Sequence, residues 1–255
     1  MFPLAGQIII EPRLFAPTVT AVFVKSMHNG EEMALLVTWH DPSPSLATAD
    51  EADDEERGES EQGSMFDDAL AVQFPTKISD GAVRPYFLMG DARRAAYAWV
   101  WQAAPSLAPE SEAVSGEVRE VRANGFTQFQ QQPDDAQDVR GRITYAEGRY
   151  QLLIHRSLRT EDKKDLQFEA GAFIPIAFAA WDGSNGEVGT RCSVSTWYHL
   201  LLEKPASNKP YILGLVGALL TIAIQFGARR SALRGGVNAN GAEPVTDKNS
   251  SVEGE

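Results

Sequence analysis

Apolar runs of strand length alternate with polar, turn-rich segments along most of the chain. Such runs occupy residues 33–39, 69–74, 149–158 and 173–181. The last run, FIPIAFAAW, is apolar and aromatic and carries no charge, which is typical of a strand buried on both faces or along a pocket wall. The pattern predicts a domain built mainly from β-strands.

Turn-forming residues separate the run at 173–181 from a further strand-like run at 192–202. Gly183, Gly186 and Gly189 can adopt the positive φ angles of tight turns. The second run resumes with Val, Ser, Thr, Trp and Tyr, residue types that favour strands. We therefore expect the two runs to form a hairpin.

Charge is concentrated in one segment, because residues 50–61 contain eight acidic side chains and a single arginine. With almost nothing apolar to bury, residues 47–63 are expected to form a disordered insertion at an edge of the β domain. The formal net charge of −12 over 255 residues would repel phosphates, so no nucleic-acid partner is expected. The acidic surface is either simply solvated or a docking surface for a basic redox carrier.

A long uncharged segment lies near the C-terminus, where residues 211–228 read YILGLVGALLTIAIQFGA. A helix of about 18 apolar residues is just long enough to cross a hydrocarbon core of ~30 Å. We expect a single-pass transmembrane anchor there. Residues 1–204 would form the folded domain, 205–210 a linker, and 229–255 a disordered polar tail.

The orientation of this anchor is predicted from the basic residues on either side of it. Three arginines follow the apolar segment and two lysines precede it, a small bias that places the tail in the cytoplasm and the domain in the periplasm or outside the cell. Residues 1–16 show no basic region followed by an apolar region, so no signal peptide is evident. Export would then depend on a partner subunit, unless the start is a processed or fused end, and a domain facing the cytoplasm stays an alternative.

The single cysteine, Cys192, excludes an intramolecular disulfide and a zinc site built from several thiolates. Covalent attachment of a c-type heme needs a C-x-x-C-H segment, which the sequence lacks, so any heme here would be b-type. Cys192 itself is interpreted as a packing residue.

Four sequence blocks, in the same order along the chain, resemble the heme-binding family typified by the gamma subunit of ethylbenzene dehydrogenase. They are SMHNGEEMALLVTWHDPS (26–43), FDDALAVQFP (66–75), RPYFLMGD (84–91) and FIPIAFAAWDGSNGEVGTRCSVSTWY (173–198). The resemblance extends from about residue 3 to residue 203. It is weakest over residues 47–63 and 105–138.

This resemblance implies an all-β fold, a β-sandwich similar to DOMON and carbohydrate-binding modules, that holds one non-covalent heme b. It also implies a role in electron transfer with a molybdenum-containing catalytic subunit and an iron-sulfur subunit, or with other cytochromes. Catalysis itself would belong to another polypeptide, since no nucleophile–base set or phosphate-binding glycine loop appears in this chain.

The resemblance also indicates which residues would contact the heme. Met89 matches the axial methionine of the family, and a thioether ligand raises heme potential. The family's second ligand is a lysine, and the Gly186–Gly189 frame aligns that position with Arg191. A guanidinium has no free electron pair, so we expect Arg191 to pair with a heme propionate instead.

The sequence leaves the second axial ligand open between water, a histidine and a lysine brought in by loop rearrangement. It also leaves open that the chain binds no heme at all. His155, in the run at 149–158, is the best substitute among the histidines, although it could equally be an ordinary strand residue. Trp101 and Trp181 could line a heme cavity or belong to the sandwich core.

Two functional hypotheses follow from these observations. The first is a membrane-anchored b-type cytochrome subunit that is not itself an enzyme. The second is a heme-free, membrane-tethered β-sandwich that acts as a scaffold or ligand-binding module, as suggested by Arg191 at the lysine position.

Overall fold

A computed structural model describes residues 1–46, 66–78, 83–105, 114–126, 128–204 and 208–238. The predicted acidic insertion at 47–63 lies outside these described residues, as do residues 239–255 of the predicted tail. The chain divides into two compact units, Met1–Pro205 and Ala206–Glu255, and each is described by itself.

The first unit contains a five-stranded antiparallel sheet. In spatial order its strands are β1 (Phe2–Pro3), β3 (Ala21–His28), β4 (Glu32–His40), β13 (Arg149–Ser157) and β12 (Arg140–Ala146). Strands β4 and β13 pair along their whole length, from Arg149 opposite His40 to Ser157 opposite Glu32. The predicted strands at 33–39 and 149–158 are therefore confirmed and lie side by side.

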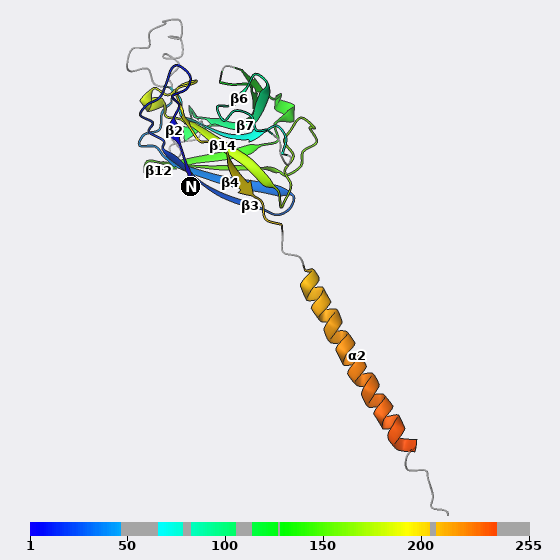
Figure 1. The fold of residues 1–255 in the computed structure, drawn as a ribbon. Coiled ribbons are helices and arrows are strands. Elements are labelled where there is room, and N and C mark those ends of the chain that lie inside the picture. The colour runs from blue at the N-terminus through cyan, green and yellow to red at the C-terminus, as the bar shows by residue number, and fades with distance from the viewer. Residues whose placement is uncertain (47–65, 79–82, 106–113, 127, 205–207, 239–255) are drawn as a thin grey trace, which may run out of the picture. The chain divides into compact units, whose positions relative to one another are not determined.

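A nine-stranded antiparallel sheet forms the second layer (Figure 1). Its main path is β11 (Phe129–Gln131), β10 (Val118–Ala123), β7 (Arg94–Gln102), β5 (Ala69–Pro75), β14 (Phe173–Trp181), β15 (Ser193–Val194) and β2 (Ala5–Gly6). Strand β16 (Tyr198–Leu201) also pairs with β14, and β6 (Gly90–Asp91) pairs with β7. A separate pair is formed by β8 (Ala104–Pro105) and β9 (Val114–Ser115), and short 3-10 turns lie at η2 (Asp134–Ala136) and η3 (Gly183–Asn185).

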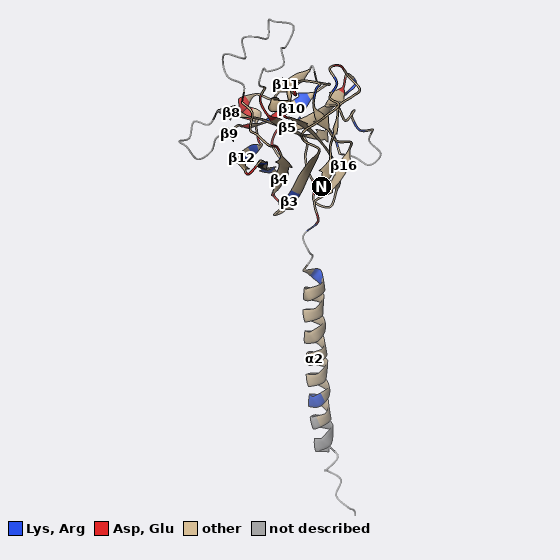
Figure 2. Cartoon of the chain, turned by 90° about the vertical axis from the view of Figure 1, so that its left-hand side faces the viewer, with Lys and Arg blue, Asp and Glu red and all other residues tan. Residues whose placement is uncertain are grey.

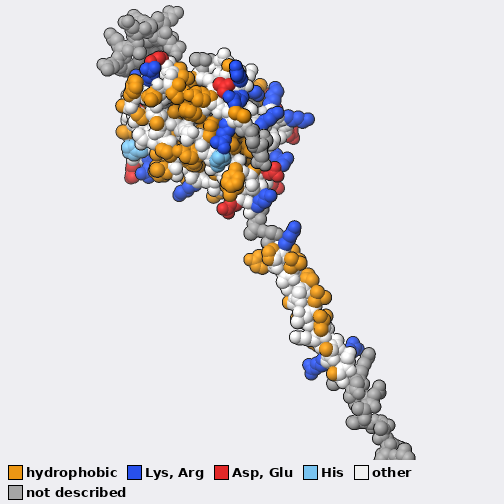
Figure 3. Space-filling model, viewed as in Figure 1, with side chains coloured by type: hydrophobic (Ala, Val, Ile, Leu, Met, Phe, Trp, Pro, Cys, Tyr) orange, Lys and Arg blue, Asp and Glu red, His pale blue; other side chains and the backbone are white. Residues whose placement is uncertain are grey.

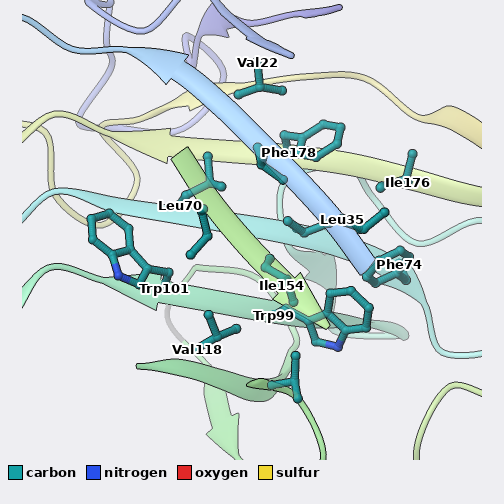
Figure 4. Close-up of a cluster of buried hydrophobic side chains, with 14 of the residues drawn as sticks. Val22, Leu35, Leu70, Phe74, Trp99, Trp101, Val118, Ile154, Ile176 and Phe178 are labelled. Carbon is teal, nitrogen blue, oxygen red and sulfur yellow. The ribbon is translucent and has the colours of Figure 1, made fainter. Parts of the chain in front are cut away.

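The two sheets pack face to face around one large apolar core (Figure 4). Alternate residues of each strand point into it, as the two-residue period of a strand requires. On β5, for example, Leu70, Val72 and Phe74 belong to this core, whereas Ala71 faces the opposite side of the sheet. The molecule therefore confirms the predicted β-sandwich.

The hairpin after β14 forms as predicted, but its second arm is not one continuous strand. Val194 pairs with Ala179, and Tyr198 pairs with Ile176. Four residue steps on the second arm thus match three on β14, which is the one-residue excess of a β-bulge. Ser195 occupies the break, where its backbone N–H donates to Phe178 O at 2.9 Å and its hydroxyl accepts from Phe178 N–H at 2.8 Å.

The second unit contains helix α2 (Lys209–Asn238). Its described side chains are exposed, and charged groups occur only toward its ends (Figure 2). Hydrophobic side chains are spread along it (Figure 3). By length and composition, the 24 residues Lys209–Ala232 are sufficient to cross a membrane.

The helix corrects one boundary of the predicted tail. The apolar segment was expected to end at residue 228 and a disordered tail to begin at 229, but α2 continues to Asn238. Alanine, arginine and leucine dominate residues 228–234, and all three are strong helix formers. Loss of hydrophobicity marks the end of the apolar segment, but it does not end a helix.

Candidate functional site

A second buried apolar cluster lies on the outer face of the nine-stranded sheet. We call it the outer cluster, and its residues are Ala71, Leu88, Met89, Ala98, Ala123, Phe126, Ala179, Trp181, Cys192 and Val194. Its strand members alternate with residues of the sandwich core, since Ala98 lies between Tyr97 and Trp99. The sheet is therefore buried on both faces here, as the uncharged sequence of β14 predicted.

Alanines form the base of the outer cluster. Ala71, Ala98, Ala123 and Ala179 come from four adjacent strands, β5, β7, β10 and β14, and none is exposed to solvent. Methyl side chains leave the surface of the sheet low and flat. A large planar group could approach such a surface closely, which bulkier strand residues would prevent.

Met89 reaches this base from the turn that leads into β6. Its side chain is fully buried, and its backbone has a φ of 60°, a left-handed conformation that is uncommon for a non-glycine residue. Holding a residue there costs on the order of 1–3 kcal/mol, and such strain clusters at functional sites. The predicted ligand is thus held in an unusual position inside an apolar environment.

Gln73 holds the turn at Met89 in place by hydrogen bonds. It is fully buried on β5, where its amide N–H donates to Phe87 O at 2.9 Å and its Oε1 accepts from Met89 N–H at 3.1 Å. From the other side, Gly125 N–H donates to Met89 O at 2.8 Å. Both backbone polar groups of Met89 are therefore bonded.

Gly90 allows the Met89 turn to approach the sheet closely. Its φ is 81°, and a Cβ added there would lie 2.7 Å from both Ala123 O and Ala96 N. Backbone atoms cannot move aside as a flexible side chain can. A side chain at this position would push the Met89 turn off the sheet.

Trp181 lies at the side of the outer cluster that is formed by the end of β14. It ends β14, is 8% exposed, and donates its indole N–H to Gly189 O at 2.9 Å. Its ring meets Phe126 edge-on, with a centroid distance of 6.3 Å. In the loop after β14, Gly186 and Gly189 have the expected positive φ angles, 64° and 57°, whereas Gly183 does not. Two aromatic rings thus screen the alanine base from water.

Cys192 enters the outer cluster from the same loop. The pairing of Ser193 with Ala180 places Cys192 one step further along, beside Trp181. Its thiol is fully buried, and burial, helped by the nearby Glu187 charge, raises its pKa. A thiol in such a position is protonated unless a metal ion displaces the proton.

Arg191 is half-buried beside Cys192. One guanidinium nitrogen lies 3.4 Å from Asn185 O, while the buried Nε has no hydrogen-bond partner among the described residues. An unpaired N–H of this kind costs free energy unless an anion accepts from it. Such a group fits a carboxylate of a bound molecule.

Of the predicted site residues, Met89 and Trp181 lie in the outer cluster together with Cys192, whereas Trp101 and His155 lie elsewhere. Trp101 belongs to the sandwich core, where its ring packs on Trp39 and Tyr150 at 5.7 and 5.3 Å. It therefore faces away from Met89. The spacing of residues along β7 could not show which of its two faces would point toward the sandwich core.

His155 lies on β13 in the other sheet, exposed and outward-facing between the buried Ile154 and Arg156. The whole sandwich core separates it from Met89. One bound iron could not contact both residues, so the structure corrects its selection as a substitute ligand.

Two residues of the site escaped the sequence analysis. Gln73 is the one polar side chain in the run ALAVQFP, and a lone amide in a buried strand is a usable signal, because it must find partners. Cys192 was interpreted only as packing. No local pattern showed that its strand step would place it in the same cluster as Met89.

Comparison with known proteins agrees with the resemblance seen in the sequence. Residues 126–193 match the family described as ethylbenzene dehydrogenase. A protein of Haloferax mediterranei named as a respiratory nitrate reductase heme subunit (ORF7) is 31% identical over 165 residues, which are 63% of this chain and 53% of that protein. The chlorate reductase gamma subunit of Ideonella dechloratans is 27% identical over 137 residues, 53% of this chain and 51% of that subunit. The chain thus spans about half the length of each relative.

Proposed function

We propose that this chain, which is similar to the ethylbenzene dehydrogenase family over residues 126–193, is a membrane-anchored electron-transfer subunit that holds one heme b. The observation that carries this proposal is Met89, buried in the outer cluster in a left-handed turn clamped by Gln73. A bound heme supplies an iron that changes by one electron, and its potential follows its axial ligands.

The residues of the outer cluster fit this group. Met89 supplies a soft thioether donor, and the four alanines leave a flat apolar base. Trp181 and Phe126 exclude water, which keeps a redox centre in a low-dielectric environment. The orphaned Nε–H of Arg191 would donate to a propionate. These residues bind and orient the group, and none of them performs a chemical step.

For the second axial position we propose Cys192 in place of His155. It is the other soft donor of the outer cluster. Met89 and Cys192 would together supply two soft donors from one buried cluster.

Replacing Cys192 with alanine should change the visible spectrum and the electron paramagnetic resonance signal of the bound heme, because one donor is lost while Met89 stays. Val194→Ala is the matched control, since it trims the same cluster without removing a donor. Spectra of Cys192→Ala that overlay those of the wild type would remove the thiol from the coordination sphere.

Gln73 acts on the site only by positioning Met89. Gln73→Leu should weaken heme binding by about 10- to 100-fold, the range typical of lost supporting contacts, and should broaden the distribution of heme spectra. Heme titration of the purified variant measures this effect. Gln137→Leu removes another buried amide, away from the outer cluster, and should bind heme as the wild type does. Equal affinities for the wild type and Gln73→Leu would argue against the clamp.

We further propose that the partners are a molybdenum-containing catalytic subunit and an iron-sulfur subunit, or other cytochromes. Helix α2 would anchor the chain, with the domain of residues 1–204 outside the cytoplasm and the C-terminal end inside. The names of the two relatives, a nitrate reductase heme subunit and a chlorate reductase gamma subunit, support a role in a respiratory reductase.

Spectroelectrochemical titration tests the electron-transfer role. The full-length protein in detergent should show one reversible one-electron transition. Heme that cannot be reduced and reoxidised reversibly would contradict the proposed function, even if it were bound.

A further inference from the structure

Three buried aspartates converge at one end of the sandwich, at a site separate from the outer cluster. Asp41 follows β4, Asp68 precedes β5, and Asp182 follows β14. Their exposed fractions are 0%, 0% and 1%. The carboxylate oxygens that they offer all lie within 4.8 Å of one another.

Asp68 is held firmly by protein donors. Its Oδ2 accepts from Ser45 N–H and Tyr150 O–H, each at 2.7 Å, and its Oδ1 accepts from Gly183 N–H at 2.8 Å. The site is therefore preorganised by contacts from both sheets.

Asp41 differs, because half of its carboxylate has no partner. Its Oδ1 accepts from Ser43 N–H at 3.1 Å, but Oδ2 is buried without any hydrogen bond within the described part of the chain. A buried, unpaired carboxylate oxygen is costly. It needs a proton or a cation.

The neighbouring charges increase the requirement for a proton or a cation at Asp41. The charged groups that act most on the Asp41 carboxyl are Asp68, Asp182 and Glu187, all acidic. Burial, with these charges added to it, raises the pKa of Asp41 to about 7. Among the described residues, no ion pair joins the three aspartates to a basic side chain.

A second cluster of acidic residues in the same domain is neutralised by a basic side chain. Glu120, Asp138 and Asp165 also lie close together, but the fully buried Arg156 reaches two of them, Glu120 at 3.7 Å and Asp165 at 3.8 Å. The aspartate cluster has no counterpart of Arg156 within the described residues.

We propose that Asp41, Asp68 and Asp182 bind a calcium ion. Every donor they offer is a carboxylate oxygen, the ligand type of hard cations. Calcium accepts six to eight oxygen ligands in flexible geometry, so backbone carbonyls and water can complete the set. Magnesium needs a stricter octahedron, and zinc favours nitrogen and sulfur.

Such an ion would join parts of the chain that are far apart in sequence. Asp41 follows a strand of the five-stranded sheet, whereas Asp68 and Asp182 flank strands of the nine-stranded sheet. Asp182 also begins the loop that carries Arg191 and Cys192. The ion would therefore fasten the two sheets together and fix the base of that loop. This inference does not depend on heme binding.

Metal analysis and calorimetry test the proposal on the full-length protein in detergent. Mass spectrometry should find about one calcium per chain before chelation. After treatment with EDTA at pH 8, calcium chloride should bind at one site and raise the melting temperature.

Asp41→Asn and Asp182→Asn should each weaken calcium binding by more than about tenfold, because affinity follows the number of ligand charges. Asp138→Asn, in the cluster that Arg156 serves, should bind calcium as the wild type does. The proposal is wrong if the wild type carries no calcium and its melting temperature changes neither with added calcium nor with EDTA. Tighter binding of magnesium than of calcium would also overturn the assignment.

Discussion

Met89→Leu is expected to weaken heme binding by at least about 100-fold, above the range that loss of a supporting residue causes. Leucine keeps most of the apolar volume of methionine, so the outer cluster should stay packed while the thioether donor is lost. Heme that remains bound should have a lower midpoint potential, because a methionine ligand raises it. Heme titration and spectroelectrochemistry measure the two effects.

The matched control is Met33→Leu. Met33 is also buried, at 2% exposure, but it belongs to the sandwich core rather than the outer cluster. Its replacement should leave heme affinity, spectrum and potential unchanged. If the Met89 and Met33 variants behave alike, Met89 does not coordinate the iron.

Arg156→Met should produce the largest loss of stability, about 3–5 kcal/mol in the free energy of unfolding, as expected when one partner of a buried ion pair is removed. The guanidinium is fully buried between Glu120 and Asp165 and donates to the backbone O of Leu166 at 2.7 Å and to the hydroxyl Oη of Tyr97 at 3.0 Å. Its removal leaves buried carboxylates without a counter-charge. Denaturant unfolding followed by tryptophan fluorescence measures the change.

Arg149→Met is the control for this variant. Arg149 begins the same strand, β13, but is exposed, so its replacement should change stability by no more than about 0.5 kcal/mol. Similar small changes for both variants would show that Glu120 and Asp165 do not need the charge of Arg156.

Local sequence patterns predicted β4, β5, β13 and β14, whereas β7, β10 and β12 were not predicted. The uncharged run FIPIAFAAW became β14 with the predicted bounds and is buried on both faces along most of its length. The turn residues after it predicted the hairpin, because glycine and aspartate act through their own backbone. In that hairpin only the bulge at Ser195 was missed, since it depends on which residues of two strands pair.

Long-range pairing explains what local patterns could not predict about the site. Trp101 and Trp181 looked equivalent in the sequence, yet one faces the sandwich core and the other the outer cluster. Asp41, Asp68 and Asp182 belong to three separate segments, and only the pairing of the strands brings them together. Local sequence patterns could not predict the alanine base either, because its members come from four strands.

The pyridine hemochrome spectrum of the full-length protein, purified from heme-sufficient cells, tests the central proposal most directly. We predict a b-type heme at about one per chain. A folded protein that contains no heme, and takes up none when heme is added, would contradict the electron-transfer function.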